Sequence, residues 1–388
     1  MAEFHHFDPR PCGFPVPGAP VLPAWGWADL TPARADAGAA GVLDGPGVRH
    51  YSRGRYALHA ALQVAGLGPG GVLLVPAYHC VTMVDPALAL GASFQCYATG
   101  PDLAPDMAQL RGLLEAADGA VRAVLIPHYF GFEQPRQMMA ELSALCLRHG
   151  ATLIEDCSHA WQIAARRARE GIRDGALLVG SPYKFFACED GGVLWGDPAR
   201  LAGLAPQPLS WMAELRGLRE GWERGRRARR GPASAQSGAA GPQGLHSVVR
   251  RGQPSSLYET AMEGRAGLRL SRWIMRRTPV AQVVHRRRRH YAQWLQASLP
   301  LKGARALFPA LAPDCAPYMF ALLLDEPERQ FYALKQAGLP IWRWDDMALS
   351  DCPVAARYRL GLLHLPCHQG LSGEQMAWMT DTLSKVLA

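Results

Sequence analysis

The stretch that decides the fold is residues 137–156, which read QMMAELSALCLRHGATLIED. Apolar residues recur at helical spacing as far as His149, and Gly150 follows as a typical helix C-cap. Residues 151–155 then form a short apolar run, which is typical of a strand covered on both faces. A helix that passes directly into such a strand indicates an α/β fold with a mainly parallel sheet.

The same alternation extends to both sides of this stretch. Helices are expected at 56–65, 81–90 and 106–116, and strands at 72–75, 93–97 and 123–127. Nearer the C-terminus, a helix at 279–299, a strand at 319–324 and helices at 328–337 and 372–387 indicate a smaller unit. The predicted fold class is therefore α/β, with a large domain whose mainly parallel sheet lies between helices, and a small α+β C-terminal domain.

Changes of composition suggest the domain boundaries. Residues 1–48 are rich in Pro, Gly and Ala and lack periodicity, so we expect an irregular N-terminal arm. The large domain is predicted to span residues 49–256, and its last part, about 203–256, is read as a flexible low-complexity excursion. Residues 257–388 are left for the small domain.

Charge and cysteine usage narrow the class of protein. The 388 residues carry a formal charge of +8, but the arginines cluster without zinc-finger spacing or an RNP-like motif, so no nucleic-acid partner is predicted. An anionic small substrate fits this charge equally well. The nine cysteines form no C-x-x-C pair, which favours a reducing, cytoplasmic setting. No run of about 18 apolar residues suggests a membrane span, and the first residues lack the apolar core of a signal peptide.

Two segments carry residues suited to catalysis. Asp156 ends an apolar strand, and ligands of parallel sheets gather at the carboxyl ends of strands. Asp156 or Ser158 could instead cap a following helix. Lys184 comes 28 positions after Asp156 among aromatic neighbours, and burial would lower the pKa of its amine and favour Schiff-base chemistry. A lone lysine is otherwise most often a surface residue.

Taken together, these segments resemble the DegT/DnrJ/StrS family of pyridoxal 5′-phosphate (PLP) dependent sugar aminotransferases, which have the type I fold. The resemblance rests on an Asp at a strand end, a His three residues later, and a Lys followed by a Gly-Gly turn. Two further motifs agree in order and spacing. The matching residues are Asp156, His159, Lys184, Gly191-Gly192, Gly54-Arg-Tyr-Ala-Leu-His59 and Pro127-His-Tyr-Phe-Gly131, with weaker matches at 336–340 and 365–369.

The resemblance implies three catalytic residues. Asp156 would pair with the pyridine nitrogen of PLP, and His159 would bond its phenolic oxygen. Lys184 would carry the cofactor as a Schiff base and, once released, would move the proton between carbon atoms. The implied reaction takes an amino group, expected to come from glutamate, to a keto group of a nucleotide-linked sugar in polysaccharide or secondary-metabolite biosynthesis. A homodimer is expected, as is general for this fold.

The cofactor's phosphate would lie at the start of a helix, where backbone N–H groups bind anions. Gly54, Arg55 and Tyr56 are the candidates there, although the family usually has a small hydroxyl residue in place of Arg55. Ser181 is the nearest substitute for the family's phosphate-binding serine, whose position holds Val179. The family's ring-stacking aromatic falls on Cys80, so His79 or Tyr78 is the alternative. In the family, a segment of the partner subunit usually reaches the phosphate, and residues 264–269 resemble that segment only weakly.

Other interpretations stay open at this point. The same cofactor supports lyase or dehydratase chemistry, and a non-catalytic PLP-binding or regulatory homologue would share most of these residues. Residues 342–346, with two Trp and two Asp, would either line the active-site mouth or pack the small domain. No metal site is predicted, because the histidines lack partners at metal-ligand spacing. This holds for His5, His6, His364 and His368.

Overall fold

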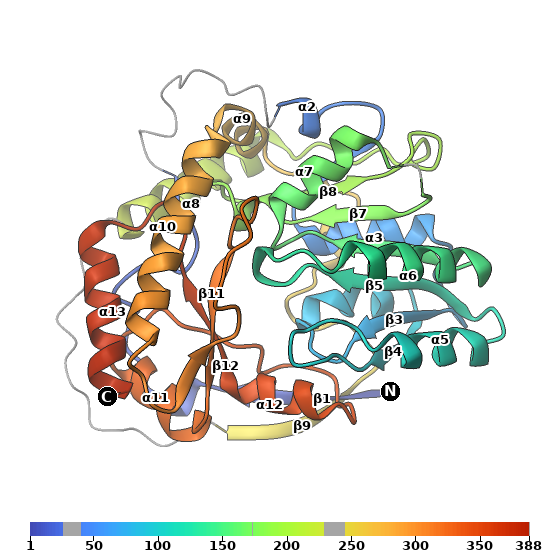
Figure 1. Ribbon diagram of the computed structural model, residues 1–388. Helices are drawn as coiled ribbons and strands as arrows, with labels where there is room; N and C mark the ends of the chain where they lie inside the picture. Colours follow the sequence, from blue (N-terminus) through green and yellow to red (C-terminus); the bar gives the residue numbers. More distant parts are fainter. Residues whose placement is uncertain (26–39, 173, 229–244, 388) are drawn as a thin grey trace.

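A seven-stranded sheet organises the large domain of the computed structural model, which describes residues 1–25, 40–172, 174–228 and 245–387 (Figure 1). The strand order is β2-β8-β7-β6-β5-β3-β4. Strands β7, β6, β5, β3 and β4 are parallel, and β8 is antiparallel to its neighbours β7 and β2. The mainly parallel sheet is thus confirmed. The strands are β2 (Val48–Tyr51), β3 (Val72–Pro76), β4 (Ser93–Tyr97), β5 (Val121–Pro127), β6 (Thr152–Asp156), β7 (Leu177–Gly180) and β8 (Gly192–Trp195).

Helices cover both faces of this sheet. In β6, Ile154 packs into a core with residues of α3, while the next residue toward the N-terminus, Leu153, packs into the core that contains Leu142 of α6. Because successive side chains point to opposite faces, a strand covered on both sides must be apolar throughout. The helices are α3 (Gly54–Val64), α4 (Asp85–Ala89), α5 (Met107–Ala116), α6 (Arg136–Arg148) and α7 (Trp161–Glu170). The helix expected at 81–90 is a short 3-10 turn, Val81–Met83, followed by α4.

The small domain is built on a three-stranded antiparallel sheet, β10-β11-β12. Phe320 of β11 faces the helices of this domain, whereas Met319 and Ala321 face Tyr78 and Phe130 of the large domain. The two domains therefore share a packed apolar boundary. The elements are α9 (Arg269–Arg277), α10 (Val280–Ser298), β10 (Ala304–Ala306), β11 (Met319–Leu324), α11 (Pro327–Gln336), α12 (Pro353–Gly361), β12 (Leu362–Pro366) and α13 (Gly373–Leu387).

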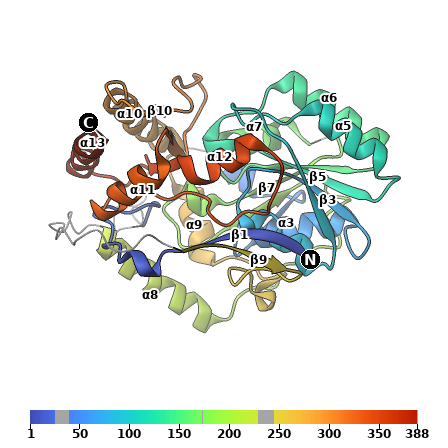
Figure 2. The same cartoon turned by 90° about the horizontal axis from the view of Figure 1, so that it is seen from below.

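The N-terminal residues are more regular than the predicted arm. Strand β1 (Ala2–Asp8) pairs antiparallel with β9 (Leu245–Arg251), and the two lie side by side in Figure 2. Phe4 and Phe7 of β1 are buried, and a short helix α2 (Ala40–Leu43) follows later. The prediction of an irregular arm over 1–48 is therefore wrong for β1. Its partner strand lies more than 230 positions away, and local sequence carries no signal of such pairing.

The expected excursion at 203–256 also contains regular structure. Helix α8 (Trp211–Ala228) occupies much of it, and β9 follows. Gly217, Gly221 and Gly225 form the buried side of α8, where a Cβ at Gly221 would fall 2.1 Å from Nε1 of Trp25. The buried stripe of this helix is glycine and carries no apolar side chain, and the Arg- and Gly-rich stretch was therefore read as low-complexity. Residues 229–244 of the excursion lie outside the described residues.

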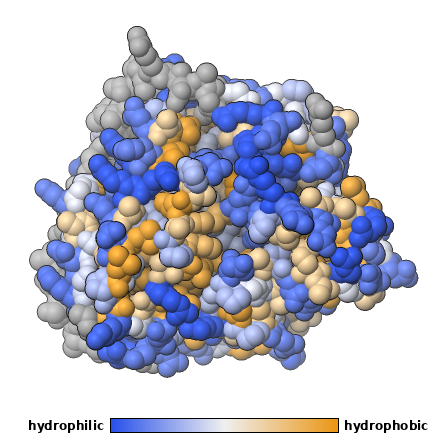
Figure 3. Space-filling view, in the orientation of Figure 1, coloured by the Kyte–Doolittle hydropathy of each residue, from blue (hydrophilic) through white to orange (hydrophobic). Residues whose placement is uncertain are grey.

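The surface mixes hydrophilic and hydrophobic residues. In the orientation of Figure 1, hydrophilic residues cover much of the molecule, and a broad group of hydrophobic residues lies on the small-domain half (Figure 3). None of the helices in the described ranges combines the length and apolar character needed to cross a bilayer.

Candidate active site

A small cavity of about 30 Å³ lies where the loops after β3, β6 and β7 meet the first turn of α3. The position agrees with the general rule that ligands of parallel sheets bind at the carboxyl ends of strands. The cavity is lined by Arg53, Gly54, Arg55, Leu58, Cys80, Thr82, Met83, Asp156, Ser158, Val179, Ser181, Tyr183 and Lys184.

Asp156 reaches this cavity from the last position of β6. Its carboxylate oxygen Oδ1 accepts a hydrogen bond of 2.8 Å from the backbone N–H of Ser158. Helix α7 has its N-cap at Ala160 and no side-chain cap, so the capping interpretation of Asp156 and Ser158 is wrong. Within the described residues, Oδ2 of Asp156 makes no hydrogen bond, which leaves this oxygen to accept a proton donor from a ligand.

Lys184 lies half-buried at the end of a 3-10 turn, Pro182–Lys184, and its backbone N–H bonds the carbonyl of Ser181. Its amine nitrogen Nζ lies 5.5 Å from the ring centre of Tyr318. In the described part of the chain no carboxylate forms an ion pair with this amine. The lysine is therefore held beside the cavity with its amine not neutralised by a protein anion.

His159 lies next to the lysine and is neutral. Its Nδ1 accepts a hydrogen bond of 3.3 Å from the backbone N–H of Phe130, so the ring proton is on Nε2. Burial lowers the pKa of His159 well below 6.5, and the charge of Lys184 lowers the pKa further. A neutral imidazole whose Nε2–H is free can donate a hydrogen bond to an oxygen of a ligand.

The first turn of α3 forms the end of the cavity suited to a phosphate. The leading N–H groups of a helix have no intrahelical partner and bind anions. Gly54 lets the loop after β7 come close, because a Cβ there would fall 2.0 Å from Oγ of Ser181. The hydroxyl of Ser181 donates to that of Ser158 over 3.0 Å, and Arg55 adds a positive charge.

Two of the predicted cofactor residues are placed elsewhere. The hydroxyl of Tyr56 accepts a hydrogen bond from the backbone N–H of Glu259, and Tyr56 does not line the cavity. His79 is fully buried beneath the cavity loop, where Nε2 accepts from the backbone N–H of Ala348. Its alternative, Tyr78, bonds Nε2 of His364 through its hydroxyl. Cys80 does line the cavity, so this chain has a sulfur atom where the family is expected to have a stacking ring.

Several residues at the site were not predicted to bind the cofactor. Tyr318 stacks on His159, and Tyr183 lies under the guanidinium of Arg53 with 4.7 Å between Arg53 Cζ and the ring centre. His364 is fully buried, and its Nδ1 finds no hydrogen-bond partner in the part of the chain that the structure describes. Burial lowers the pKa of His364 to about 3, and the charge of Lys184 contributes. Of residues 342–346, Trp344 packs near His159, with 5.8 Å between ring centroids.

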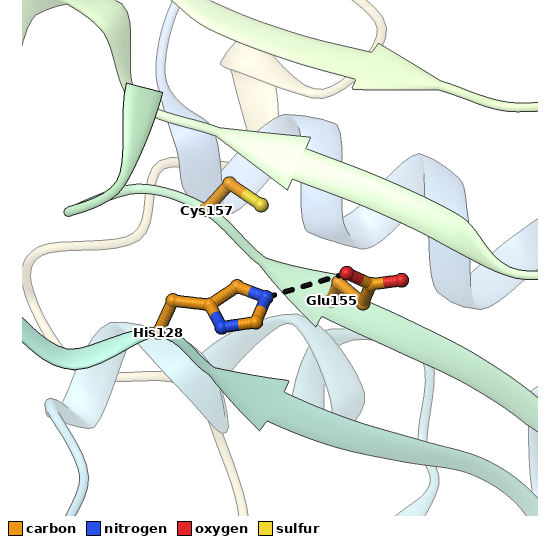
Figure 4. Close-up of side chains that lie close together, drawn as sticks. All are labelled: His128, Glu155 and Cys157. Atoms are coloured by element: carbon orange, nitrogen blue, oxygen red, sulfur yellow. Dashed lines mark hydrogen bonds and ion pairs between the residues drawn. The ribbon is translucent and has the colours of Figure 1, made fainter. Parts of the chain in front are cut away.

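His128, Glu155 and Cys157 also lie close together, as Figure 4 shows. Nδ1 of His128 accepts from the backbone N–H of Gln134, so the proton is on Nε2 and is donated to Glu155 over 3.3 Å. Arg167 pairs with the same carboxylate over 2.7 Å. A protonated Nε2 has no lone pair for a metal. The cluster is thus explained by hydrogen bonds, on the sheet face opposite to Ile154.

Residues 50–205 match the model of the DegT/DnrJ/EryC1/StrS aminotransferase family. This segment contains the start of α3, Asp156, His159 and Lys184. Over residues 50–205 the chain is therefore similar to this family. The family's enzymes depend on PLP, in agreement with the cofactor expected from the sequence.

The residues around the cavity fit PLP. A carboxylate, a lysine and a neutral imidazole donor are present, and the glycine at position 54 leaves room at an anion-binding helix start. Asp156 would hold the pyridine nitrogen, and the first turn of α3 with Ser181 would hold the phosphate.

Two solved structures share the fold over most of this chain. The sugar aminotransferase CalS13 from Micromonospora echinospora superimposes with a TM-score of 0.61 at 17% identity, over 94% of this chain and 99% of that one. The NtdA protein from Bacillus subtilis, solved with PMP, gives a TM-score of 0.57 at 15% identity. The superposition covers 88% of this chain and 73% of that one.

A curated relative has a different kind of name. The 8-amino-7-oxononanoate synthase of Burkholderia ambifaria strain MC40-6 is 28% identical over 139 residues, which is 36% of this chain. The chain spans only about 30% of the length of this relative.

Proposed function

We propose that this DegT-type chain is a PLP-dependent aminotransferase. The observation that carries the proposal is the meeting of Asp156, Lys184 and the first turn of α3 around one cavity, with His159 beside it. Bound PLP would supply an electrophilic carbonyl carbon and an electron-withdrawing ring. The three elements would give such a cofactor a charge partner, an amine and a phosphate site.

Each residue then has a task of its own. The carboxylate of Asp156 would keep the ring nitrogen protonated, and the Nε2–H of His159 would hold the phenolic oxygen. Lys184 would hold the carbonyl carbon through its amine and, when displaced by the amino donor, would move the proton at the substrate carbon. The two tasks of Lys184 require an amine free of a carboxylate partner, as observed among the described residues.

We further propose glutamate as the amino donor and a keto group of a nucleotide-linked sugar as the acceptor, in a cytoplasmic pathway of polysaccharide or secondary-metabolite biosynthesis. Support comes from the family match and from the sugar aminotransferase name of CalS13. The cationic side chains Arg53 and Arg55 at the cavity favour anionic ligands. The synthase name of the curated relative favours a synthase reaction as the second candidate.

A second copy of the chain is the proposed partner. Trp211, Met212, Leu215 and Leu218 on α8 are between 40% and 71% exposed. Three of them recur at i, i+4 and i+7, so they form one apolar face of the helix. A contiguous exposed apolar face of this kind is typical of a protein interface.

The purified chain tests the enzymatic proposal directly. PLP is added, the product is reduced with borohydride, and peptide mass spectrometry locates the modified lysine. We expect modification of Lys184 and none in Lys184→Ala, whereas Lys335→Ala, which removes another partly buried lysine, keeps it. Modification elsewhere, or none at all, would contradict the proposed cofactor site.

Glutamate then separates the candidate reactions. Without an acceptor, an aminotransferase releases one 2-oxoglutarate per site, and Asp156→Asn should slow this release about 100-fold or more, because the ring nitrogen loses its charge partner. A synthase or a non-catalytic homologue would bind PLP but release no 2-oxoglutarate. Comparing a keto-sugar nucleotide with the free keto sugar as acceptors tests the nucleotide requirement.

A further inference from the structure

Arg287 is a fully buried arginine in the middle of α10, and its relative exposure is 0%. Burying a guanidinium costs free energy unless every N–H group finds a partner. Within the described residues Arg287 forms no ion pair with a carboxylate, so its charge is balanced by neutral acceptors alone. An arginine in this situation needs an explanation.

All five N–H groups of Arg287 are in use. Nη2 donates to the carbonyls of Lys184 and Phe185 over 2.9 and 3.0 Å. Nη1 donates to the carbonyls of Pro317 and Tyr318 over 3.0 and 3.2 Å. Nε donates to the side-chain oxygen of Gln369 over 2.9 Å.

These acceptors come from both domains. Lys184 and Phe185 belong to the loop after β7 in the large domain, whereas Tyr318 lies directly before β11 and Gln369 follows β12 in the small domain. Gln369 closes the network, because its side-chain NH₂ donates to the carbonyl of Phe185 over 2.9 Å. The network therefore joins the backbone of the catalytic lysine to the residue whose ring lies 5.5 Å from the lysine amine.

We infer that Arg287, with Gln369, is a positioning residue that sets where Lys184 lies relative to Tyr318 and His159. This inference rests on the proposed PLP function. A guanidinium is suited to the task because its planar fork fixes five donors at once, and a lysine ammonium in its place has three donors without that geometry. Burial lowers the pKa of Arg287 to about 10, which still leaves it charged at neutral pH.

The neighbouring Arg288 offers a matched control. Its Nη1 also donates to two backbone carbonyls, those of Ala312 and Cys315, over 2.6 and 2.8 Å. Both arginines thus tie α10 to backbone, but only Arg287 reaches the lysine loop. Arg288→Lys should lower the free energy of unfolding and leave the position of Lys184 unchanged.

The first measurement uses the chain without added cofactor. Hydrogen exchange is compared in wild type, Arg287→Lys and Arg288→Lys, for peptides covering 181–190 and 315–320. We expect Arg287→Lys to speed exchange in both peptides together, and Arg288→Lys to leave 181–190 unchanged. Unchanged exchange at 181–190 in Arg287→Lys would overturn the inference, whether or not the chain binds PLP.

The second measurement uses PLP. Arg287→Lys should weaken PLP binding about tenfold and reduce the borohydride-fixed fraction on Lys184, while Arg288→Lys stays within twofold of wild type. In turnover, kcat should fall more than KM changes. Wild-type affinity and wild-type fixation in Arg287→Lys would show that the arginine is only structural. A wild-type chain that binds no PLP contradicts the proposed function instead, and the exchange result then decides the inference alone.

Gln369→Leu covers the case in which Arg287→Lys does not fold. It removes the acceptor of Nε and the donor to Phe185 while leaving four of the hydrogen bonds of Arg287 in place. We expect Gln369→Leu to speed hydrogen exchange in 181–190 and 315–320 and to reduce the borohydride-fixed fraction on Lys184, each less than Arg287→Lys does. A folded Gln369→Leu chain with wild-type values in both would likewise overturn the inference.

Discussion

The imidazole of His159 is stacked on the phenol ring of Tyr318, with 4.2 Å between the ring centroids and 24° between the ring planes. The backbone of Phe130 holds both partners, since its N–H donates to Nδ1 of His159 and its carbonyl accepts from the N–H of Tyr318 over 2.8 Å. Phe130 has a φ of +56°, which is uncommon for a residue with a side chain. Such backbone strain often occurs at functional sites.

Replacing Tyr318 tests the role of the stacked pair. Aromatic pairs contribute roughly 0.5–1.5 kcal/mol beyond burial. Tyr318→Leu, which loses the ring, is expected to lower kcat up to about tenfold, since 1.4 kcal/mol corresponds to one factor of ten. Tyr318→Phe keeps the ring and should stay near wild type. Steady-state kinetics with glutamate measures both, and equal losses in the two variants would speak against stacking.

Gly54→Ala tests the phosphate end of the cavity. The added methyl group would fall 2.0 Å from Oγ of Ser181, so the first turn of α3 has to move away from the loop after β7. We expect PLP affinity to fall at least about tenfold, measured by equilibrium dialysis. Gly112→Ala in the exposed part of α5 is the control, because nothing lies within 4 Å of its added Cβ.

Gly112→Ala should bind PLP normally and stabilise the chain by about 0.5–1 kcal/mol, the usual gain of alanine over glycine within a helix. Chemical denaturation measures that gain. If Gly54→Ala binds PLP as well as Gly112→Ala does, the helix start does not hold the phosphate.

Buried histidines predict how stability depends on pH. Burial lowers the pKa of His79 to about 4, and of His364 and His368 to about 3, from 6.5 in the unfolded chain. The unfolded state therefore binds more protons below pH 6.5, so their contribution is complete above pH 6.5 and is lost as the pH falls toward 4 and then 3. Each histidine contributes a slope of up to about 1.4 kcal/mol per pH unit.

Urea unfolding at pH 7.5, 6.5, 5.5 and 4.5 measures this slope. Asp345 acts in the opposite direction, because burial raises its pKa to about 6, so its contribution is lost as the pH rises through that value. We expect the histidines to dominate and the free energy of unfolding to fall on acidification. His368→Gln should flatten the curve, and an unchanged slope in that variant would contradict the assignment.

The apolar face of α8 predicts the oligomeric state. Replacing Trp211 and Leu215 together by Ser should shift the chain from dimer to monomer in light scattering after size exclusion, because both are more than half exposed on one helix face. Leu299→Ser, at a residue 74% exposed after α10, is the control and should leave the dimer intact. A wild-type chain that is monomeric at micromolar concentration would rule out this interface.

The sequence alone determined the alternation of helices and strands from α3 to β6 in the large domain, since that pattern is local. Strand residues 93–97 and 319–324 were placed at their observed bounds, and most predicted helices lie within two residues of the observed ones. Asp156 and Gly54 were found because each ends or begins an element whose period is visible, whereas Lys184 was found from its spacing to Asp156 and its aromatic neighbours. The weak points were α8, whose buried stripe is glycine, and β1, whose partner strand is distant.

Only the tertiary structure decided which side chains surround the lysine. Tyr318, His364 and Arg287 come from the small domain, 100 to 180 positions after Lys184, and no spacing rule connects them to it. The same is true of the misplaced His79 and Tyr56, whose rings turn away from the cavity to satisfy backbone N–H groups. Local sequence sets the period and the strand ends, whereas burial and hydrogen-bond satisfaction across distant segments set the contacts.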